Sequence, residues 1–178
     1  SYADRVSRID SKKKIVVVPD LPLVTAVQID SASKLAKFPE LQLDSPVFLY
    51  VGNLGVHQGV DLLLDAFEIL QRDGLRGSLV IAGGQQAEIE RFLPAHPAAH
   101  FFGIVEPDDL PAVYRVADVV VAPRRSGTNT PMKIFDYMHS GCTIVATKLE
   151  THTQVLDEDC AILVEPSAEG LAAGMFRA

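Results

Sequence analysis

From residue 47 onward, the apolar positions of this 178-residue chain follow two patterns that alternate with each other. Continuous runs of four or five apolar residues are typical of strands that are buried on both faces. Between these runs, apolar residues recur every three to four positions, as in Leu63, Phe67 and Leu70, which predicts helices with one buried face. The alternation predicts an α/β fold, a Rossmann-like parallel sheet with helices on both faces.

The predicted elements continue to the end of the chain. Strands are expected at 47–51, 79–82, 100–103, 119–122, 143–146 and 161–164, and helices at 60–72, 86–93, 108–117, 131–140 and 167–177, with a turn at 151–156. Upstream, 15–18 predicts a strand and 31–37 a short helix within a segment of no clear period. We interpret 1–45 as an interdomain linker region with the start of the domain, and 46–178 as one domain. Because both ends interrupt the pattern, we expect a piece of a longer protein.

Composition and charge exclude several classes of protein. A net charge of −7 argues against a nonspecific nucleic-acid binder, which needs a broad basic surface. Cys142 and Cys160 show neither metal-ligand spacing nor a disulfide framework, and no metal site is predicted. There is no apolar run of the roughly 18 residues that a membrane span needs, and no signal peptide opens the chain. These features predict a cytoplasmic protein.

The first candidate ligand loop follows the strand at 47–51. In a parallel sheet, ligands bind beyond the carboxyl ends of the strands. Gly52, Asn53 and Gln58 lie in a glycine-rich loop that leads into a helix, where glycines let a phosphate approach the backbone and free N–H groups attract it. Glycines that serve only the turn remain an alternative. The spacing differs from the dinucleotide fingerprint, which argues against an oxidoreductase.

The second candidate loop follows the strand at 119–122 and also opens a helix. Its polar and flexible residues are a candidate phosphate cradle: Arg124, Ser126, Gly127, Thr128, Asn129 and Thr130. Thr130 and Pro131 could equally serve as the N-cap and the first residue of the helix. Lys133, in the predicted first turn, opposes the helix dipole at a cost of about 0.3–1 kcal/mol, which an anionic ligand would offset. Asp136 lies on the same face and could accept a sugar hydroxyl.

With these residues identified, the chain resembles the C-terminal, donor-binding domain of a GT-B glycosyltransferase, close to glycosyltransferase family 4, the group 1 glycosyl transferases. The resemblance rests on four segments. Residues 14–20 resemble the interdomain segment, and residues 50–54 and 58–61 resemble the first phosphate loop. The base-binding segment is resembled by 102–103 with Leu110, Tyr114 and 117–118, and the donor-site helix by 131–138 with Gly141.

This resemblance implies a hexosyltransferase that binds a nucleoside diphosphate sugar and transfers the sugar with retention, without metal or cofactor. It implies that the base meets the backbone near Gly103, Ile104 and Val105, that Asp136 holds ribose hydroxyls, and that the diphosphate lies over the first loop and the donor-site helix, with Lys133 as the catalytic cation. A missing N-terminal domain would hold the acceptor, a saccharide, lipid or small molecule, so the isolated domain should be inactive. Peripheral membrane association of the full-length protein is left open.

The sequence departs from the family pattern at three positions. Asn53 and Gln58 stand where many members have Arg and Lys, and Thr128 stands where the first of two glutamates is expected. Lys133, with Arg124 or Arg125, would compensate for the lost positive charge. Two alternatives stay open: a nucleotide-sugar epimerase of the same architecture, and a noncatalytic binding or scaffold homologue.

Overall fold

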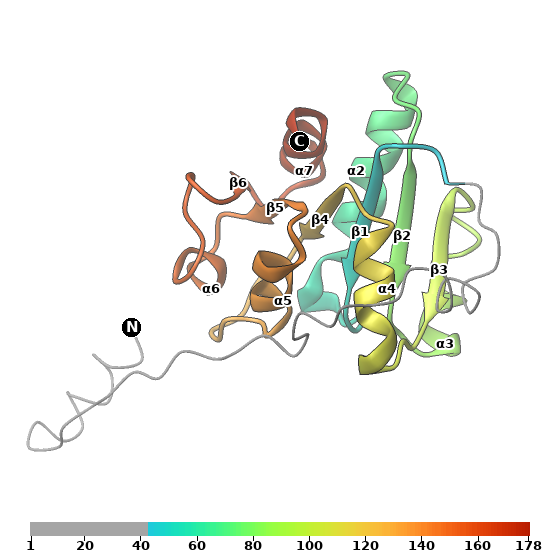
Figure 1. Cartoon of the computed structure of the whole chain (residues 1–178). Helices are drawn as coiled ribbons and strands as arrows, with labels where there is room; N and C mark the ends of the chain where they lie inside the picture. The colour runs from blue at the N-terminus through green and yellow to red at the C-terminus, as the bar shows by residue number, and fades with distance from the viewer. Residues whose placement is uncertain (1–42) are drawn as a thin grey trace, which may run out of the picture.

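The structure is a computed structural model, which describes residues 43–178. Its six strands form one parallel sheet in the order β3-β2-β1-β4-β5-β6 (Figure 1). They are β1 (Val47–Val51), β2 (Ser78–Ala82), β3 (Ala99–Gly103), β4 (Val119–Ala122), β5 (Thr143–Thr147) and β6 (Ile162–Val164). All six predicted strands of this region are confirmed to within one residue at each end. The strand predicted at 15–18, the helix at 31–37 and nearly all of the predicted linker lie outside the described residues.

The helices alternate with these strands. They are α2 (Val60–Arg72), α3 (Gln86–Ile89), α4 (Leu110–Arg115), α5 (Lys133–Ser140), α6 (Glu150–Thr153) and α7 (Ala168–Arg177), with 3-10 turns at Val56–Gln58 and Pro107–Asp109. The helix predicted at 60–72 is confirmed at both ends. The segment 151–156, expected to be a turn, contains part of α6. Of the helices between residues 43 and 178, none is both long and apolar enough to cross a membrane.

Apolar side chains fill the space on both faces of the sheet. Phe48 and Tyr50 of β1 point to the face that α2 and α7 cover, whereas Val47 and Leu49 point to the face of α4 and α5. In Figure 1, α4 and α5 lie in front of the sheet and α2 lies behind it. Side chains on both faces of this strand are therefore buried, which explains why its sequence is continuously apolar rather than alternating.

Three predicted helices differ from the structure at their ends. The helix predicted at 131–140 begins at Lys133, because Ile134 N–H donates to Pro131 O and Phe135 N–H to Met132 O, bonds of tight three-residue turns. Thr130 is therefore not its N-cap. The helix predicted at 108–117 is split into a 3-10 turn and α4, with Pro111 in the first turn of α4. The helix predicted at 86–93 ends at Ile89.

The carboxyl ends of the strands lie at one edge of the sheet, and the loops that follow them are tied together there. Gly52 N–H donates to Ala82 O at 2.9 Å, and Gly83 N–H donates to Gly103 O at 2.6 Å. A Cβ atom at Gly83 would lie 2.0 Å from the carbonyl oxygen of Gly52, so only glycine permits this approach. The loops after β1, β2 and β3 thus form a connected rim above the sheet.

Candidate functional site

Two adjoining cavities open at this edge, where the strand order reverses. β1 pairs with β2 on one side and with β4 on the other, which makes the gap between β1 and β4 the topological switch point. The first cavity, of about 340 Å³, lies over the ends of β1, β2 and β3. The second, of about 470 Å³, lies over β1, β4 and the start of α5. Both are lined by Val51, Gly52, Asn53 and Leu110, so together they form one continuous site.

A tyrosine holds the two strands at the switch point. β1 and β4 pair only at Phe48 and Leu49, below the site. Beyond them, the hydroxyl of Tyr137 from α5 accepts from Val51 N–H at 3.0 Å and donates to Val121 O at 3.3 Å. This fully buried hydroxyl satisfies backbone groups that the diverging strands leave unpaired. The second cavity lies above this bridge.

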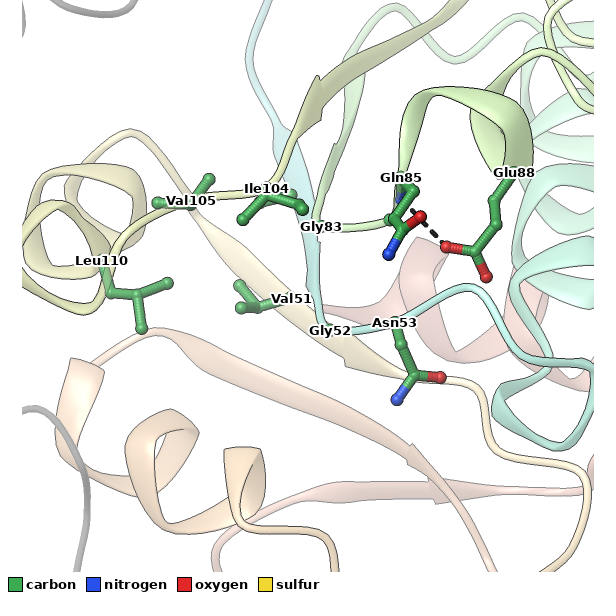
Figure 2. Close-up of a pocket in the computed structure, with 11 residues that line it drawn as sticks. Val51, Gly52, Asn53, Gly83, Gln85, Glu88, Ile104, Val105 and Leu110 are labelled. Atoms are coloured by element: carbon green, nitrogen blue, oxygen red, sulfur yellow. Dashed lines mark hydrogen bonds between the residues drawn. The ribbon is translucent and has the colours of Figure 1, made fainter.

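The first cavity is an apolar slot with a polar rim. Figure 2 shows Val105 and Leu110 on one side of it and the Gln85 and Glu88 side chains together on the other. The carboxylate of Glu88 accepts a hydrogen bond from Gln85 N–H at 2.9 Å. Ile104, which is 69% exposed, stands at the mouth of the slot. Such a slot suits a flat ring that presents polar atoms at its edge.

The second cavity contains an ammonium group held by uncharged partners. Lys133 Nζ donates to Gln58 Oε1 at 3.2 Å and lies 3.9 Å from the centre of the Tyr50 ring. Although part of the Lys133 side chain is accessible, its ammonium group is buried. Burial, with a smaller contribution from the charge of Arg124, lowers the pKa of Lys133 to about 7. An anion in this cavity would favour the protonated form and raise the pKa again.

Arg124 is the second cation of this cavity and is 6% exposed. Its Nη1 donates to Asn129 O at 2.8 Å, and its backbone carbonyl accepts from the buried Thr147 hydroxyl at 2.7 Å. Gly127 has φ +147°, and a Cβ there would lie 2.6 Å from the guanidinium carbon. Glycine at this position therefore lets the loop cover Arg124 without displacing its guanidinium or straining the backbone.

The structure distinguishes two groups among the predicted site residues. Those that line a cavity are Gly52, Asn53, Gln58, Ile104, Val105, Arg124, Asn129, Lys133 and Asp136. Gly103 borders the first cavity through its bond from Gly83. Ser126, Gly127, Thr128 and Thr130 line neither cavity and lie along the solvent-facing loop after β4. Arg125 points away toward α2, where its guanidinium forms an ion pair with Asp61.

Sequence reasoning missed several residues of the site. Glu88 was predicted only as part of the helix at 86–93 and Gln85 was given no role, although both follow a Gly-Gly pair at a strand end. That position relative to a parallel strand was the available signal. Tyr50 and Tyr137 carried no signal, because an aromatic residue within an apolar pattern is expected in the core. Within residues 43–178, no three His, Cys, Asp or Glu side chains gather as metal ligands would.

The fold defines a class of protein, a Rossmann-like α/β domain with cavities at its switch point, and similarity to known proteins shows its family. The chain belongs to the group 1 glycosyl transferases, whose family model matches residues 45–178. It is 31% identical over 153 residues to the putative colanic acid biosynthesis glycosyl transferase WcaI of Escherichia coli (strain K12), covering 77% of this chain and 37% of that protein. It is 27% identical over 116 residues to the sulfoquinovosyl transferase SQD2 of Arabidopsis thaliana, covering 65% and 22%.

Solved structures share the fold. Sucrose-phosphate synthase from Thermosynechococcus elongatus matches with a TM-score of 0.63 and 24% identity, over 75% of this chain and 36% of that one. The C-terminal domain of the group 1 glycosyl transferase LpcC from Francisella tularensis matches with a TM-score of 0.61 and 19% identity, over 74% and 73%. Anabaena Alr3699/HepE, in complex with UDP and glucose, has a TM-score of 0.62 and 18% identity, over 72% and 37%. The resemblance seen in the sequence and the Rossmann-like fold are confirmed.

Proposed function

We propose that this chain is the donor-binding domain of a glycosyltransferase and that one nucleoside diphosphate sugar occupies both cavities. The observation that carries the proposal is the pairing of an apolar slot with a cavity that contains two buried cations, Lys133 and Arg124. The nucleoside would lie in the slot and the diphosphate beside the cations. The relative HepE, which has been solved with UDP and with UDP-glucose, binds ligands of this class.

The cations of the second cavity are suited to a diphosphate. Their contacts within the site include the side-chain amide oxygens of Gln58 and Asn129, the Tyr50 ring and the Asn129 backbone carbonyl, which stabilise a cation less than a carboxylate does. A diphosphate would place negative charge directly beside the two cations. During transfer, negative charge grows on the departing diphosphate, and fixed cations in a partly desolvated cavity stabilise that charge strongly. Lys133 is therefore assigned the catalytic role, without a metal or cofactor.

The uncharged residues of the loop after β1, where many family members have Arg and Lys, agree with this assignment. The amide of Gln58 is not itself a cation, but its oxygen holds the ammonium of Lys133, and Gly52 leaves the space that the ammonium occupies. The positive charge would thus come from the start of α5 instead of from the loop after β1. Asp136, which is buried and lines the same cavity, is assigned to the ribose hydroxyls. Asn129, whose backbone and side-chain oxygens accept from Arg124, lines the same cavity and is assigned to the donor.

The acceptor would be held outside the described cavities. The chain covers 37% of WcaI and 22% of SQD2, so a second domain that carries a saccharide, lipid or small-molecule acceptor belongs to the proposal. Its closure over the donor would exclude water and align the reacting atoms. Transfer with retention of the anomeric configuration, and inactivity of this domain alone, follow from the family resemblance and are proposed with it.

Binding to the 178-residue chain tests the proposal. Calorimetric titration with UDP, GDP and ADP should detect at least one ligand, and Lys133→Ala should weaken its binding by about tenfold or more, the effect expected for a lost charged contact. Lys148→Ala is the matched control, because Lys148 is exposed and pairs with Glu158 on the surface. Absence of nucleotide binding by folded protein, or equal affinity in Lys133→Ala, would contradict the proposal and favour a scaffold homologue.

A further inference from the structure

The carboxylate of Glu88 is a polar group of the slot that the proposed function leaves without a role. Glu88 is half-buried and lines the first cavity only, on the side opposite Val105 and Leu110 (Figure 2). Its Oε2 accepts from Gln85 N–H at 2.9 Å, which fixes the carboxylate at the rim. A carboxylate offers about four acceptor positions, and within the described part of the chain the structure shows this one bond to it, so most positions are available to a ligand.

A fixed carboxylate discriminates among bases by their pattern of donors. Guanine presents two adjacent donors on its Watson–Crick edge, N1–H and the N2 amino group. Uracil presents a single N–H between two carbonyl oxygens, and these oxygens are repelled by the carboxylate oxygens. Adenine and cytosine each place one amino group beside a ring nitrogen that is itself an acceptor. An acceptor-only side chain therefore favours guanine and disfavours the other three bases.

The neighbouring side chain completes the pattern. Figure 2 shows Gln85 beside Glu88 at the same rim, and its amide nitrogen can donate to a carbonyl oxygen. A donor next to a carboxylate matches the order O6, N1–H and N2 amino along the guanine edge. We infer that Glu88, with Gln85, reads the Watson–Crick edge of the base and selects a guanosine diphosphate sugar as the donor. This inference rests on the proposed function.

The arrangement of the two cavities assigns Glu88 to the base and not to the ribose. Lys133, Arg124 and Asp136 line the second cavity, where the diphosphate and the ribose hydroxyls are proposed to lie. The slot continues from there past Val51 and Leu110, which both cavities share. The base is the part of the donor farthest from the diphosphate, and Glu88 lines only the far cavity.

The experiment compares GDP, UDP, ADP and CDP by calorimetry on the 178-residue chain, at one salt concentration, in wild type and Glu88→Gln. Glutamine keeps an oxygen for Gln85 N–H but replaces one acceptor by a donor. We expect wild type to bind GDP about tenfold or more tightly than UDP, and Glu88→Gln to lose most of that preference, as a lost two-point base contact should. Glu90→Gln is the matched control: Glu90 accepts from Gln86 at 3.0 Å and lines neither cavity.

The outcomes separate this inference from the proposed function. Equal weakening of all four nucleotides in Glu88→Gln would assign Glu88 to the ribose and overturn the inference. A preference for UDP, ADP or CDP that still depends on Lys133 would overturn it and leave the donor site standing. Absence of binding by every nucleotide would overturn both. Loss of the GDP preference in Glu88→Gln alone supports the inference.

Discussion

Lys133 Nζ lies 3.9 Å from the centre of the Tyr50 ring, and these two residues come from elements more than eighty positions apart. The Tyr50 ring is fully buried, and its hydroxyl donates to Asn53 O at 2.6 Å. The ring therefore contacts the ammonium with its face, while its hydroxyl is bonded to the loop after β1. A cation–π contact stabilises the ammonium more weakly than an ion pair would, which is consistent with its lowered pKa.

The protonation of Lys133 predicts that nucleotide binding takes up protons. Its pKa is about 7 in the free protein and would rise when a diphosphate lies beside it. At pH 8 the free amine is mostly neutral, so the liganded state must bind up to one more proton per site, and affinity should increase as the pH falls from 9 toward 7. Calorimetry in buffers of different ionisation enthalpy measures this uptake.

Lys133→Arg is the control for that measurement, since a guanidinium stays protonated at pH 8. Its complex should form with little or no proton uptake. Equal uptake in wild type and Lys133→Arg would assign the proton to another group and contradict the prediction.

Substitution of Gly52 should disturb the site through Lys133. A Cβ at this position would lie 2.5 Å from Lys133 Nζ, at a φ of +142° that favours glycine. We expect Gly52→Ala to weaken nucleotide binding by about tenfold or more, because the ammonium must move, and to destabilise the fold by about 1–3 kcal/mol through backbone strain. Denaturant unfolding and calorimetry measure the two effects separately.

Gly74→Ala serves as the control for backbone strain alone. Gly74 also has positive φ, +91°, but a Cβ there would meet no atom of the described residues, 43–178, within 4 Å. This variant should lose stability and keep its nucleotide affinity. If both variants bind as wild type does, Gly52 has no special relation to the proposed anion site.

Two tyrosines in edge-to-face contact should respond differently to loss of their hydroxyl groups. Tyr137 bridges Val51 and Val121, so Tyr137→Phe leaves a partly buried N–H and a buried carbonyl without that partner and should cost about 1–3 kcal/mol of unfolding free energy. Among residues 43–178 the buried hydroxyl of Tyr114 has no hydrogen-bond partner, so Tyr114→Phe should be neutral or slightly stabilising. Urea unfolding of both variants checks the difference, and equal losses would contradict it.

Much of the fold could be predicted from the sequence, because burial on both faces of a parallel strand leaves a direct mark. The continuous apolar run of Val47–Val51 and the period of Val60–Arg72 each identify an element without knowledge of its neighbours. The start of α5 was less predictable. Thr130 and Pro131 are good capping residues, but capping preference is a local tendency of about 1 kcal/mol, and here α5 is preceded by tight turns at Pro131 and Met132 instead.

The candidate site was only partly visible in the sequence. By itself, the sequence determined that Gly52, Gln58, Lys133 and Asp136 lie at one edge of the sheet, because strand polarity brings the carboxyl ends together. Only the tertiary structure decided that Arg124 lines the cavity while its neighbour Arg125 pairs with Asp61 on α2, since side-chain direction in a loop depends on distant contacts. The same holds for Tyr50 beneath Lys133 and for Glu88 at the slot, which come from separate strand–helix units.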